Sequence, residues 1–283
     1  MRIDLHTHSR VSDGTDTPTR LVLKALEAGL DVIALTDHDT FDGVPEAAAA
    51  GKRIGVRVVP GVEMSAAVAN HSVHLLGYGC DVHNEALSTE LETLRAARAA
   101  RLPAMCKRLT DLGVPLTEEE VRTTSQSARA LGRPHVADAL VAKGYAADRT
   151  EAFDRYLAEG KPGYVARYNT DLARAITLVH DAGGAAVIAH PWARGNRDVV
   201  TASLLESLVA GYGLDGIEVD HEDHDLDTRR LLFDMGGRLG LVRTGSSDYH
   251  GEGKKGHELG CNLTRKSAFL ELVSRIRHRG GVV

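Results

Sequence analysis

The stretch Ile3-Asp4-Leu5-His6-Thr7-His8 joins a short apolar run to two histidines at its end. Successive side chains of a strand point to opposite faces of a sheet, so His6 and His8 share one face, where both rings can bind a single metal ion. The stretch therefore predicts a buried strand that carries metal ligands at its carboxyl end.

Six further apolar runs of the 283-residue chain show the same arrangement, each with a His, Asp or Glu at its end or beside it. Strands whose carboxyl ends meet at one place, with helical segments between them, predict a parallel β/α barrel with its functional groups on one face. The runs are residues 32–35 before Asp37 and His38, 56–62 before Glu63, Val73 beside His74, 185–189 before His190, 217–219 before Asp220, and 241–247 before Asp248 and His250.

Helical periodicity fills several of the intervals between these runs. Residues 18–30 carry apolar side chains at helical spacing, with Pro18 near the first turn and Gly29 at the end. Residues 172–182 form a second such helix before the strand that leads to His190. Strand and helix therefore alternate in both halves of the chain.

The strand pattern stops after Gly77, and helical signals replace it for a long interval. We therefore expect a helical insertion, or cap domain, at residues 86–165, within a barrel built from residues 1–85 and 166–283. An insertion after the fourth strand should emerge at the carboxyl ends of the strands and overhang the site.

Three kinds of signal indicate helices within this insertion. Residues 87–112 form a long helical stretch that we expect to bend at Pro103. Thr117 and Glu120 have the spacing of a capping box, and Pro134 begins another amphipathic segment.

The composition agrees with a soluble enzyme that can bury a sizeable core. The chain is 43% hydrophobic and has a formal net charge of -5, so attraction for a phosphorylated substrate must come from bound cations and local Arg or Lys, and we expect no stable DNA binding. No apolar run approaches membrane-spanning length, and no signal peptide fits before the first strand. The expected location is the cytoplasm.

The polar residues at the strand ends are histidines and carboxylates, which are ligands of borderline and hard metals. For one such histidine alone, a capping or core role is the better explanation. Nine positions together favour a metal centre. The candidates are His6, His8, Asp13, His38, Glu63, His74, His190, Asp248 and His250.

These motifs resemble the signature blocks of the PHP family, named for polymerase and histidinol phosphatase. The resemblance covers residues 1 to about 85 and about 166 to 265, and it implies a distorted seven-stranded β/α barrel that binds two or three Mn, Fe or Zn ions. The matching blocks are Asp4-Leu5-His6-Thr7-His8, Thr36-Asp37-His38-Asp39, Pro60-Gly61-Val62-Glu63, His190-Pro191 and Ser247-Asp248-Tyr249-His250.

The resemblance also implies how the nine ligands are shared among the ions. His6, His8, Glu63 and Asp248 resemble the ligands of one ion, Glu63, His74 and His190 those of a second, and Asp13, His38 and His250 those of a third. The expected nucleophile is a metal-bound hydroxide held by Glu63, His38 and His190.

Within the family, the helical insertion and the Gly132-Arg133-Pro134-His135 block resemble the branch that acts on nucleoside 3′,5′-bisphosphates and on the 5′ ends of short RNAs. We expect hydrolysis of a phosphate monoester of a substrate such as adenosine 3′,5′-bisphosphate, with 5′-3′ trimming of short RNA as a second activity. The alternatives are a phosphatase for histidinol phosphate or another small phosphomonoester, and a non-catalytic metal-binding accessory domain. The complete ligand set argues against the last.

Five residues are candidates for substrate binding. Arginines at a helix start and in a loop at the active face can hold phosphate bidentately, and the alternative for each is an ordinary surface position. His135 is expected to assist Arg133 or to cap the helix. His221 and His224 are expected to contact the substrate or to support the site, and the alternative for both is a solvated loop. The candidates are Arg133, His135, Arg194, His221 and His224.

Arg95, Arg98 and Arg101 have a three-residue spacing that places them on roughly one helical stripe. This spacing favours a solvated helix face, with contact to an RNA backbone as the alternative.

Overall fold

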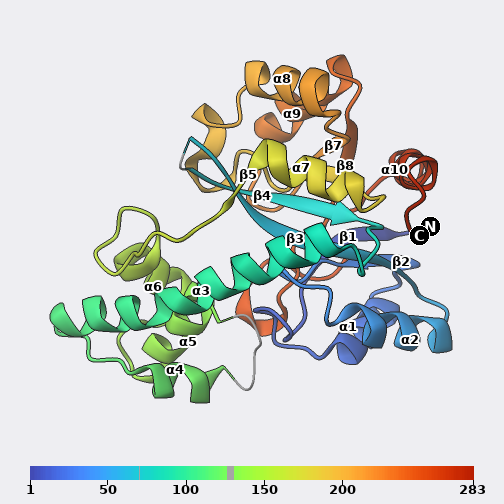
Figure 1. The fold of residues 1–283 in the computed structure, drawn as a ribbon. Coiled ribbons are helices and arrows are strands. Elements are labelled where there is room, and N and C mark those ends of the chain that lie inside the picture. The colour runs from blue at the N-terminus through green and yellow to red at the C-terminus, as the bar shows by residue number, and fades with distance from the viewer. Residues whose placement is uncertain (70, 126–130) are drawn as a thin grey trace.

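The computed structural model describes residues 1–69, 71–125 and 131–283, apart from the side chain of Arg194. Seven strands form one curved, mixed sheet in the order β1-β2-β3-β4-β6-β7-β8, and a two-residue strand, β5, pairs with β3 (Figure 1). The strands are β1 Ile3–Thr7, β2 Val32–Leu35, β3 Arg57–Val68, β4 His71–Tyr78, β5 Thr170–Asp171, β6 Ala185–Ile188, β7 Gly216–Asp220 and β8 Val242–Gly245.

The two ends of this sheet meet, so the barrel is nearly closed. The amide of His8 donates to the carbonyl of Tyr249 at 2.8 Å, and the amide of Thr264 donates to the carbonyl of Ile3 at 2.9 Å. Both contacts join β1 to the segment that follows β8. The predicted seven-stranded barrel fold is confirmed.

The expectation that all seven strands are parallel is wrong for β4. β3 and β4 form a long antiparallel hairpin, and β4 is also antiparallel to β6. Because of this pairing, β3 continues five residues past Glu63 to Val68, and Glu63 and His74 lie within their strands instead of at the ends. Their short apolar runs resemble those of the parallel strands, so the sequence pattern alone did not reveal the reversal.

Helices surround the barrel, and the two helices predicted outside the insertion, at residues 18–30 and 172–182, are both present. α1 begins at Pro18, with the Thr17 side chain accepting from the amide of Arg20, and α7 begins after the capping side chain of Asp171. The helices outside the insertion are α1 Pro18–Glu27, α2 Val44–Ile54, α7 Leu172–Asp181, α8 Ala202–Tyr212, α9 Leu226–Arg238 and α10 Lys266–His278.

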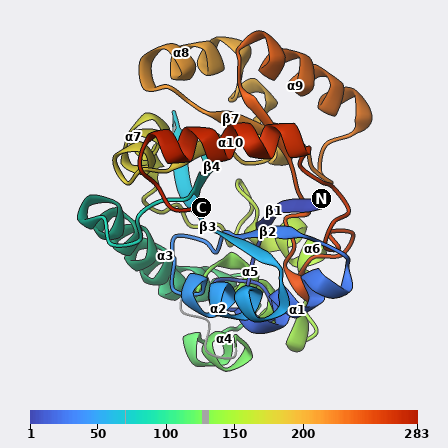
Figure 2. The same ribbon diagram turned by 90° about the vertical axis from the view of Figure 1, so that its right-hand side faces the viewer.

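The last helix, α10, covers the amino end of the barrel, close to both chain termini (Figure 2). Its buried residues Phe269, Leu272 and Ile276 pack in one cluster with inward-facing strand residues such as Leu5 and Val187. The opposite end of the barrel, where the parallel strands finish, therefore remains for the functional groups.

The insertion is helical, with α3 Glu85–Asp111, α4 Glu118–Thr124, α5 Arg133–Ala142 and α6 Arg149–Ala152 followed by a short π-helical turn, Phe153–Leu157. Pro103 lies inside α3, and both halves of the Thr117–Glu120 capping box are formed. These helices and the loop after them have a hydrophobic core of their own, which is separate from that of the barrel.

α3 enters the insertion from the opposite end of the barrel to the one predicted. Because β4 is antiparallel, its last residue, Tyr78, pairs with Ala185 at the start of β6, at the amino end of the barrel. The 27-residue α3 then runs back along the sheet toward α4–α6 (Figure 1). Leu94 packs in the barrel core and Leu102 in the insertion core, so the two cores meet midway along this helix.

Among the described residues, no helix has the length and apolar character needed to cross a membrane.

Candidate metal centre

Glu63 lies at the middle of the predicted ligands. Five histidines from β1, the loop after β1, the loop after β2, β4 and the loop after β6 surround its carboxylate. Oε2 lies 3.4 Å from His6 Nε2, 3.2 Å from His8 Nε2 and 3.0 Å from His38 Nδ1, and Oε1 lies 2.6 Å from His74 Nδ1 and 3.2 Å from His190 Nε2.

Asp248 faces Glu63 across the rings of the first two histidines. Its Oδ1 lies 3.4 Å from His6 Nε2 and 3.3 Å from His8 Nε2. The ligand atoms of His6, His8 and Asp248 all lie within 4.8 Å of one another, as do those of His38, Glu63 and His74. Both groups can hold a metal ion.

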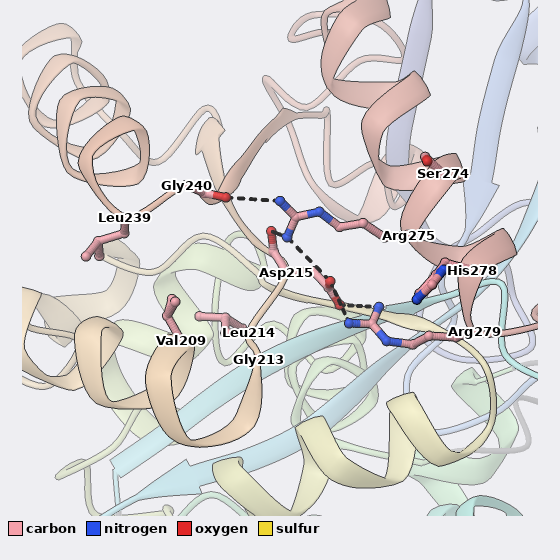
Figure 3. Close-up of a pocket in the computed structure, with 10 residues that line it drawn as sticks. All are labelled: Val209, Gly213, Leu214, Asp215, Leu239, Gly240, Ser274, Arg275, His278 and Arg279. Atoms are coloured by element: carbon pink, nitrogen blue, oxygen red, sulfur yellow. Dashed lines mark hydrogen bonds and ion pairs between the residues drawn. The ribbon is translucent and has the colours of Figure 1, made fainter.

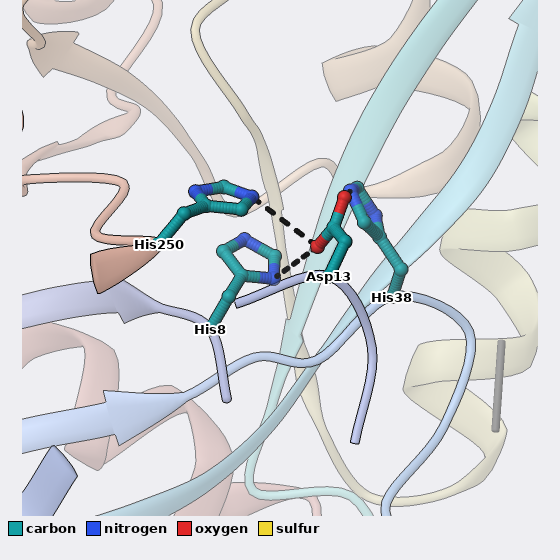
Figure 4. Close-up of side chains that lie close together, drawn as sticks. All are labelled: His8, Asp13, His38 and His250. Atoms are coloured by element: carbon teal, nitrogen blue, oxygen red, sulfur yellow. Dashed lines mark ion pairs between the residues drawn. The ribbon is translucent and has the colours of Figure 1, made fainter. Parts of the chain in front are cut away.

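Asp13 organises a further group with His8, His38 and His250, whose ligand atoms also lie within 4.8 Å of one another (Figure 4). Asp13 Oδ1 lies 3.3 Å from His250 Nε2 and 3.8 Å from His8 Nδ1, and Oδ2 lies 3.5 Å from His38 Nε2. The family resemblance implied three of these four residues as one set, and the structure adds His8 through its second ring nitrogen, Nδ1.

The packing of these groups fits bound cations better than an ordinary polar core. Each of the nine predicted ligands is at most 7% exposed. His38 Nδ1 and Asp248 Oδ1 are buried and make no hydrogen bond, although polar atoms lie 3.0–3.5 Å from each. Such contacts without hydrogen-bond geometry are what ligands of a shared ion produce, because buried polar groups otherwise find partners.

The electrostatics of the cluster favour ionised carboxylates. Burial alone would raise the pKa of Glu63, but the positive charges of His38, His74 and His6 hold it well below its usual range. Burial is likewise outweighed at Asp13 by His38 and His250, which lower the pKa of that carboxyl. Both groups are therefore ready to bind a cation.

Glu218, which the sequence did not single out, is a buried carboxylate that holds two of the histidines. Its Oε1 lies 3.3 Å from His6 Nδ1 and accepts from Ser246 Oγ, and its Oε2 accepts from the amide of His190 at 2.9 Å. Glu218 thus contacts His6 Nδ1 and orients the ring so that the other nitrogen, Nε2, faces Glu63. The available signal was a Glu in the middle of an apolar strand, where Asp220 drew attention instead.

Asp37 performs a similar task for the loop after β1. Its carboxylate accepts from the amide and hydroxyl of Ser9, at 2.8 and 2.7 Å, and from the hydroxyl of Ser12 at 2.7 Å. These bonds hold the turn that presents Asp13.

The backbone is strained where several of these groups emerge. Of the described non-glycine residues, Asp39, Ala69, His190 and Asp248 have positive φ. His190 and Asp248 are predicted ligands, and Asp39 directly follows the predicted ligand His38. Left-handed backbone is costly outside glycine and persists where surrounding structure enforces it, as at functional sites.

His221, predicted as a substrate contact, lies beside the predicted ligands, with Nε2 3.3 Å from Asp248 Oδ2. His257, which matched no sequence pattern, joins it in a further metal-capable group with Asp248. Lys254 Nζ lies 2.6 Å from the same Asp248 oxygen, so its ammonium already compensates charge there. His257 was missed because its loop has no strand-like or motif spacing.

The other predicted substrate residues have varied surroundings. His224 Nδ1 lies 3.0 Å from the Val219 carbonyl, and His135 Nδ1 accepts from the amide of Gly132 at 3.0 Å, which caps α5. The side chain of Arg194 lies outside the described part of the chain.

Arg133, at the start of α5, lies with its guanidinium 5.6 Å from the ring centre of Phe153 and 5.5 Å from that of Tyr164. It also donates to the carbonyl of Leu157 at 3.3 Å. These contacts fix a half-buried cation among residues of the insertion.

The predicted solvated face of Arg95, Arg98 and Arg101 is wrong, because Arg98 and Arg101 are each only 5% exposed. They lie where α3 passes between the two hydrophobic cores. Arg98 Nη2 donates to Asp39 Oδ2 at 2.8 Å, next to the predicted ligand His38. The three-residue spacing predicts that these side chains share one side of a helix. It does not predict whether that side faces solvent or another part of the protein.

A pocket on the far side of the barrel has a structural explanation. Asp215 precedes β7 and therefore lies at the amino end of the strands, where Arg275 and Arg279 from α10 pair with it at 3.5 and 3.0 Å (Figure 3). His180 Nε2 lies 2.8 Å from the same carboxylate. This network joins α7 and α10 to the sheet.

Comparison with known proteins agrees with the geometry of the centre. The family model for the PHP domain matches residues 4–182. The 3′,5′-nucleoside bisphosphate phosphatase of Chromobacterium violaceum is 37% identical over 261 residues, which cover 91% of this chain and 90% of that protein. A 5′-3′ exoribonuclease of Haemophilus influenzae is 33% identical over 252 residues, which cover 88% of this chain and 90% of that protein.

Among solved structures, a protein from Bifidobacterium adolescentis assigned as a metal-dependent phosphoesterase matches with a TM-score of 0.90 and 36% identity, covering 96% of each chain. The matched family model, these relatives and the shared barrel with its clusters of metal-capable side chains identify the chain as a member of the PHP family of phosphoesterases.

Proposed function

We propose that the chain is a metal-dependent hydrolase that removes a phosphate group from nucleoside 3′,5′-bisphosphates such as adenosine 3′,5′-bisphosphate. The observation that carries the proposal is the convergence of five histidines on the Glu63 carboxylate. The substrate class is supported by the similarity to the Chromobacterium violaceum phosphatase.

The nine ligands would hold two or three divalent ions of Mn, Fe or Zn. Glu63 and Asp248 would serve the first group with His6 and His8, and Glu63 would reach the second through its other oxygen. Asp13 would anchor the third. When bound, such ions polarise phosphoryl oxygens and lower the pKa of water.

The charge of the loaded centre suits a phosphate dianion. Three divalent ions with Asp13, Glu63 and Asp248 leave about +3, whereas the protein as a whole is acidic, with a net charge of -5. Glu218 adds a negative charge and Lys254 a positive one, so these two side chains nearly cancel. A negative substrate would therefore be attracted to the centre rather than to the surface in general.

We infer that residues 86–165 form a cap that selects the substrate while the barrel performs the chemistry. Arg149 of α6 supports this role, since its Nη1 donates to the carbonyl of Asp13 at 3.4 Å and to that of Gly253 at 3.3 Å. Asp138 of α5 holds the same guanidinium through two oxygens at 2.5 and 2.6 Å. The insertion is thus tied to the loop that carries a predicted ligand.

Trimming of short RNA from its 5′ end is a second candidate activity, favoured by the similarity to the Haemophilus influenzae exoribonuclease. Hydrolysis of histidinol phosphate or another small phosphomonoester is the competing enzyme function. A role as a non-catalytic metal-binding accessory domain is disfavoured by the similarity, over most of the chain, to relatives named as a phosphatase and an exoribonuclease.

A substrate panel tests these functions directly. Purified protein loaded with Mn would be assayed against adenosine 3′,5′-bisphosphate, histidinol phosphate and a 5′-phosphorylated oligonucleotide, with phosphate release and chain shortening as readouts. We expect the bisphosphate to give the highest kcat/KM. A preference for histidinol phosphate would overturn the proposed substrate, and no hydrolysis of any compound by metal-loaded protein would overturn the enzyme assignment.

A further inference from the structure

Arg149, the first residue of α6, contacts two loops of the barrel at once. Its Nη1 donates to the carbonyl of Asp13 at 3.4 Å and to that of Gly253 at 3.3 Å. Asp13 lies in the loop after β1, and Gly253 lies in the segment after β8. One guanidinium of the insertion therefore bridges the two ends of the barrel sheet.

These two loops carry predicted ligands of the third ion. Asp13 itself belongs to that group, and so does His250, three residues before Gly253, with Asp13 Oδ1 3.3 Å from His250 Nε2. The loops are also bonded to each other, because the amide of Thr15 donates to the His250 carbonyl at 3.1 Å and the amide of Glu252 donates to Thr15 Oγ1 at 3.0 Å. A shift of either loop would thus change the distance between two ligands of one ion.

Asp138 of α5 fixes the guanidinium from the side of the insertion. Its Oδ1 accepts from Arg149 Nε at 2.5 Å and its Oδ2 accepts from Nη2 at 2.6 Å. A bidentate pair of this kind sets the orientation of the guanidinium plane as well as its position. The side chain of Arg149 is only 16% exposed, so the insertion and the barrel together determine where it lies.

The same pair explains how an arginine can lie beside a cation site. A free positive charge next to Asp13 would repel a metal ion, and the Asp138 carboxylate neutralises it. Arg149 also binds Asp13 through the backbone carbonyl, which leaves the carboxylate to face His38 and His250. The contact therefore positions the ligand without competing for it.

Residue 253 has to be a glycine for this contact to form. A Cβ added at Gly253 would overlap Nη1 of Arg149 and would lie 2.7 Å from its Cζ. Such overpacking forces side chains to move. A methyl group at this position would push the guanidinium away while Arg149 and Asp138 are both retained, so a second, independent change tests the same contact.

We propose that Arg149 is a positioning residue for the third ion, and that this ion and the docking of the insertion on the barrel stabilise each other. The proposal rests on the proposed function only through the assignment of Asp13, His38 and His250 to a third ion. If docking strengthens binding of that ion by some factor, the ion strengthens docking by the same factor. The two groups that share Glu63 would fill whether or not the contact is made.

Metal binding tests the first half of the proposal. Metal-stripped protein would be titrated with Mn in competition with a chelator, with ions per chain as the readout. Arg149→Gln and Gly253→Ala should each weaken the third ion about tenfold to a hundredfold, the range for residues that support metal ligands, and should leave the other two ions unchanged. Unchanged affinity for the third ion in both variants, or a parent that binds only two ions, would overturn the proposal.

Matched controls separate this effect from a general loss of stability. Arg155→Gln removes an arginine that bonds Glu151 within the insertion, and Gly211→Ala adds a methyl group that faces open space on α8. Both should bind Mn as the parent does. Tm is measured for every variant, and Gly253→Ala decides the outcome if Arg149→Gln does not fold.

A double variant shows whether Arg149 acts through Asp13. Asp13→Asn removes a ligand of the third ion alone, so adding Arg149→Gln to it should cause no further loss of Mn, because both changes act on the same ion. A further loss in the double variant would mean that Arg149 supports the whole centre through the fold, which contradicts the proposal.

Hydrogen exchange of the amides of α5 and α6 tests the reciprocal effect. In the parent, their protection should rise over the Mn concentrations at which the third ion binds. The rise should be missing in Asp13→Asn and in Arg149→Gln and present in Arg155→Gln. Protection that is independent of the third ion in the parent would contradict the coupling. Since neither measurement uses a substrate, the result stands apart from whether the bisphosphate is hydrolysed.

Discussion

His74 Nδ1 lies 2.6 Å from Glu63 Oε1, although the two residues belong to strands that run in opposite directions. In the β3–β4 ladder His74 is paired with Ser65, so it is a diagonal neighbour of Glu63 on the same face of the sheet. The reversal of β4 therefore brings a predicted ligand to Glu63 from a strand that runs in the opposite direction.

Glu63→Gln should remove most of the bound metal and most of the activity. The carboxylate has histidine nitrogens on both oxygens, and a neutral amide would replace one oxygen with a group that repels cations. Metal content per chain, measured by mass spectrometry after purification, checks this. Glu119→Gln, an exposed position on α4, is the control, and full metal content in Glu63→Gln would show that Glu63 is not a shared ligand.

Glu218→Gln should lower metal affinity about tenfold to a hundredfold without removing the ions altogether. The substitution keeps the size of the side chain but weakens the support of His6 Nδ1 and of the His190 amide. Competition with a chelator measures the affinity. An unchanged affinity would mean that Glu218 contributes to folding alone.

Arg133→Ala should reduce kcat/KM for adenosine 3′,5′-bisphosphate about tenfold to a hundredfold, a loss of about 1.5 to 3 kcal/mol in transition-state stabilisation, since a charge-assisted contact to the non-reacting phosphate would be lost. A simple monophosphate should be affected much less. Steady-state kinetics on both substrates decides the role. Equal losses would assign Arg133 to the catalytic centre, and parent-like kinetics on both would remove it from substrate binding.

Asp215→Asn should destabilise the fold in a pH-dependent way, far from the metal centre. Burial by itself would raise the pKa of Asp215, but the bonds from His180, the Ala186 amide and Arg279 lower it. A folded-state pKa below the unfolded value of 3.8 means that the unfolded chain binds more protons as pH falls. The stabilisation is therefore complete above about pH 5 and is lost as the pH falls through the folded-state pKa.

Urea unfolding measures this effect. At pH 7 the variant should be less stable by about 1.5 to 3 kcal/mol, the cost of a charge-assisted hydrogen bond, and the difference should narrow below about pH 4. A difference that stays constant over this range would show that the carboxylate charge is not what stabilises this end of the barrel.

Residue type and local spacing were sufficient to predict much of this protein. The alternation in Ile3-Asp4-Leu5-His6-Thr7-His8 predicted a strand with both histidines on one face, and His6 and His8 both contact Glu63. The barrel was predictable for the same reason, since each strand carries its own apolar run. The proline at the start of a helix, Pro18, and the capping box at Thr117 are also local signals, and the structure contains both features.

Long-range packing decided the rest. The direction of β4 depends on its partners, β3 and β6, and not on its own short run of residues. Glu218 became part of the site because the barrel brings β7 beside β1 through β8, which no spacing in the sequence encodes. Arg98 and Arg101 became buried because α3 passes between two cores. A helix stripe specifies which side chains lie together, whereas only the tertiary structure specifies what they face.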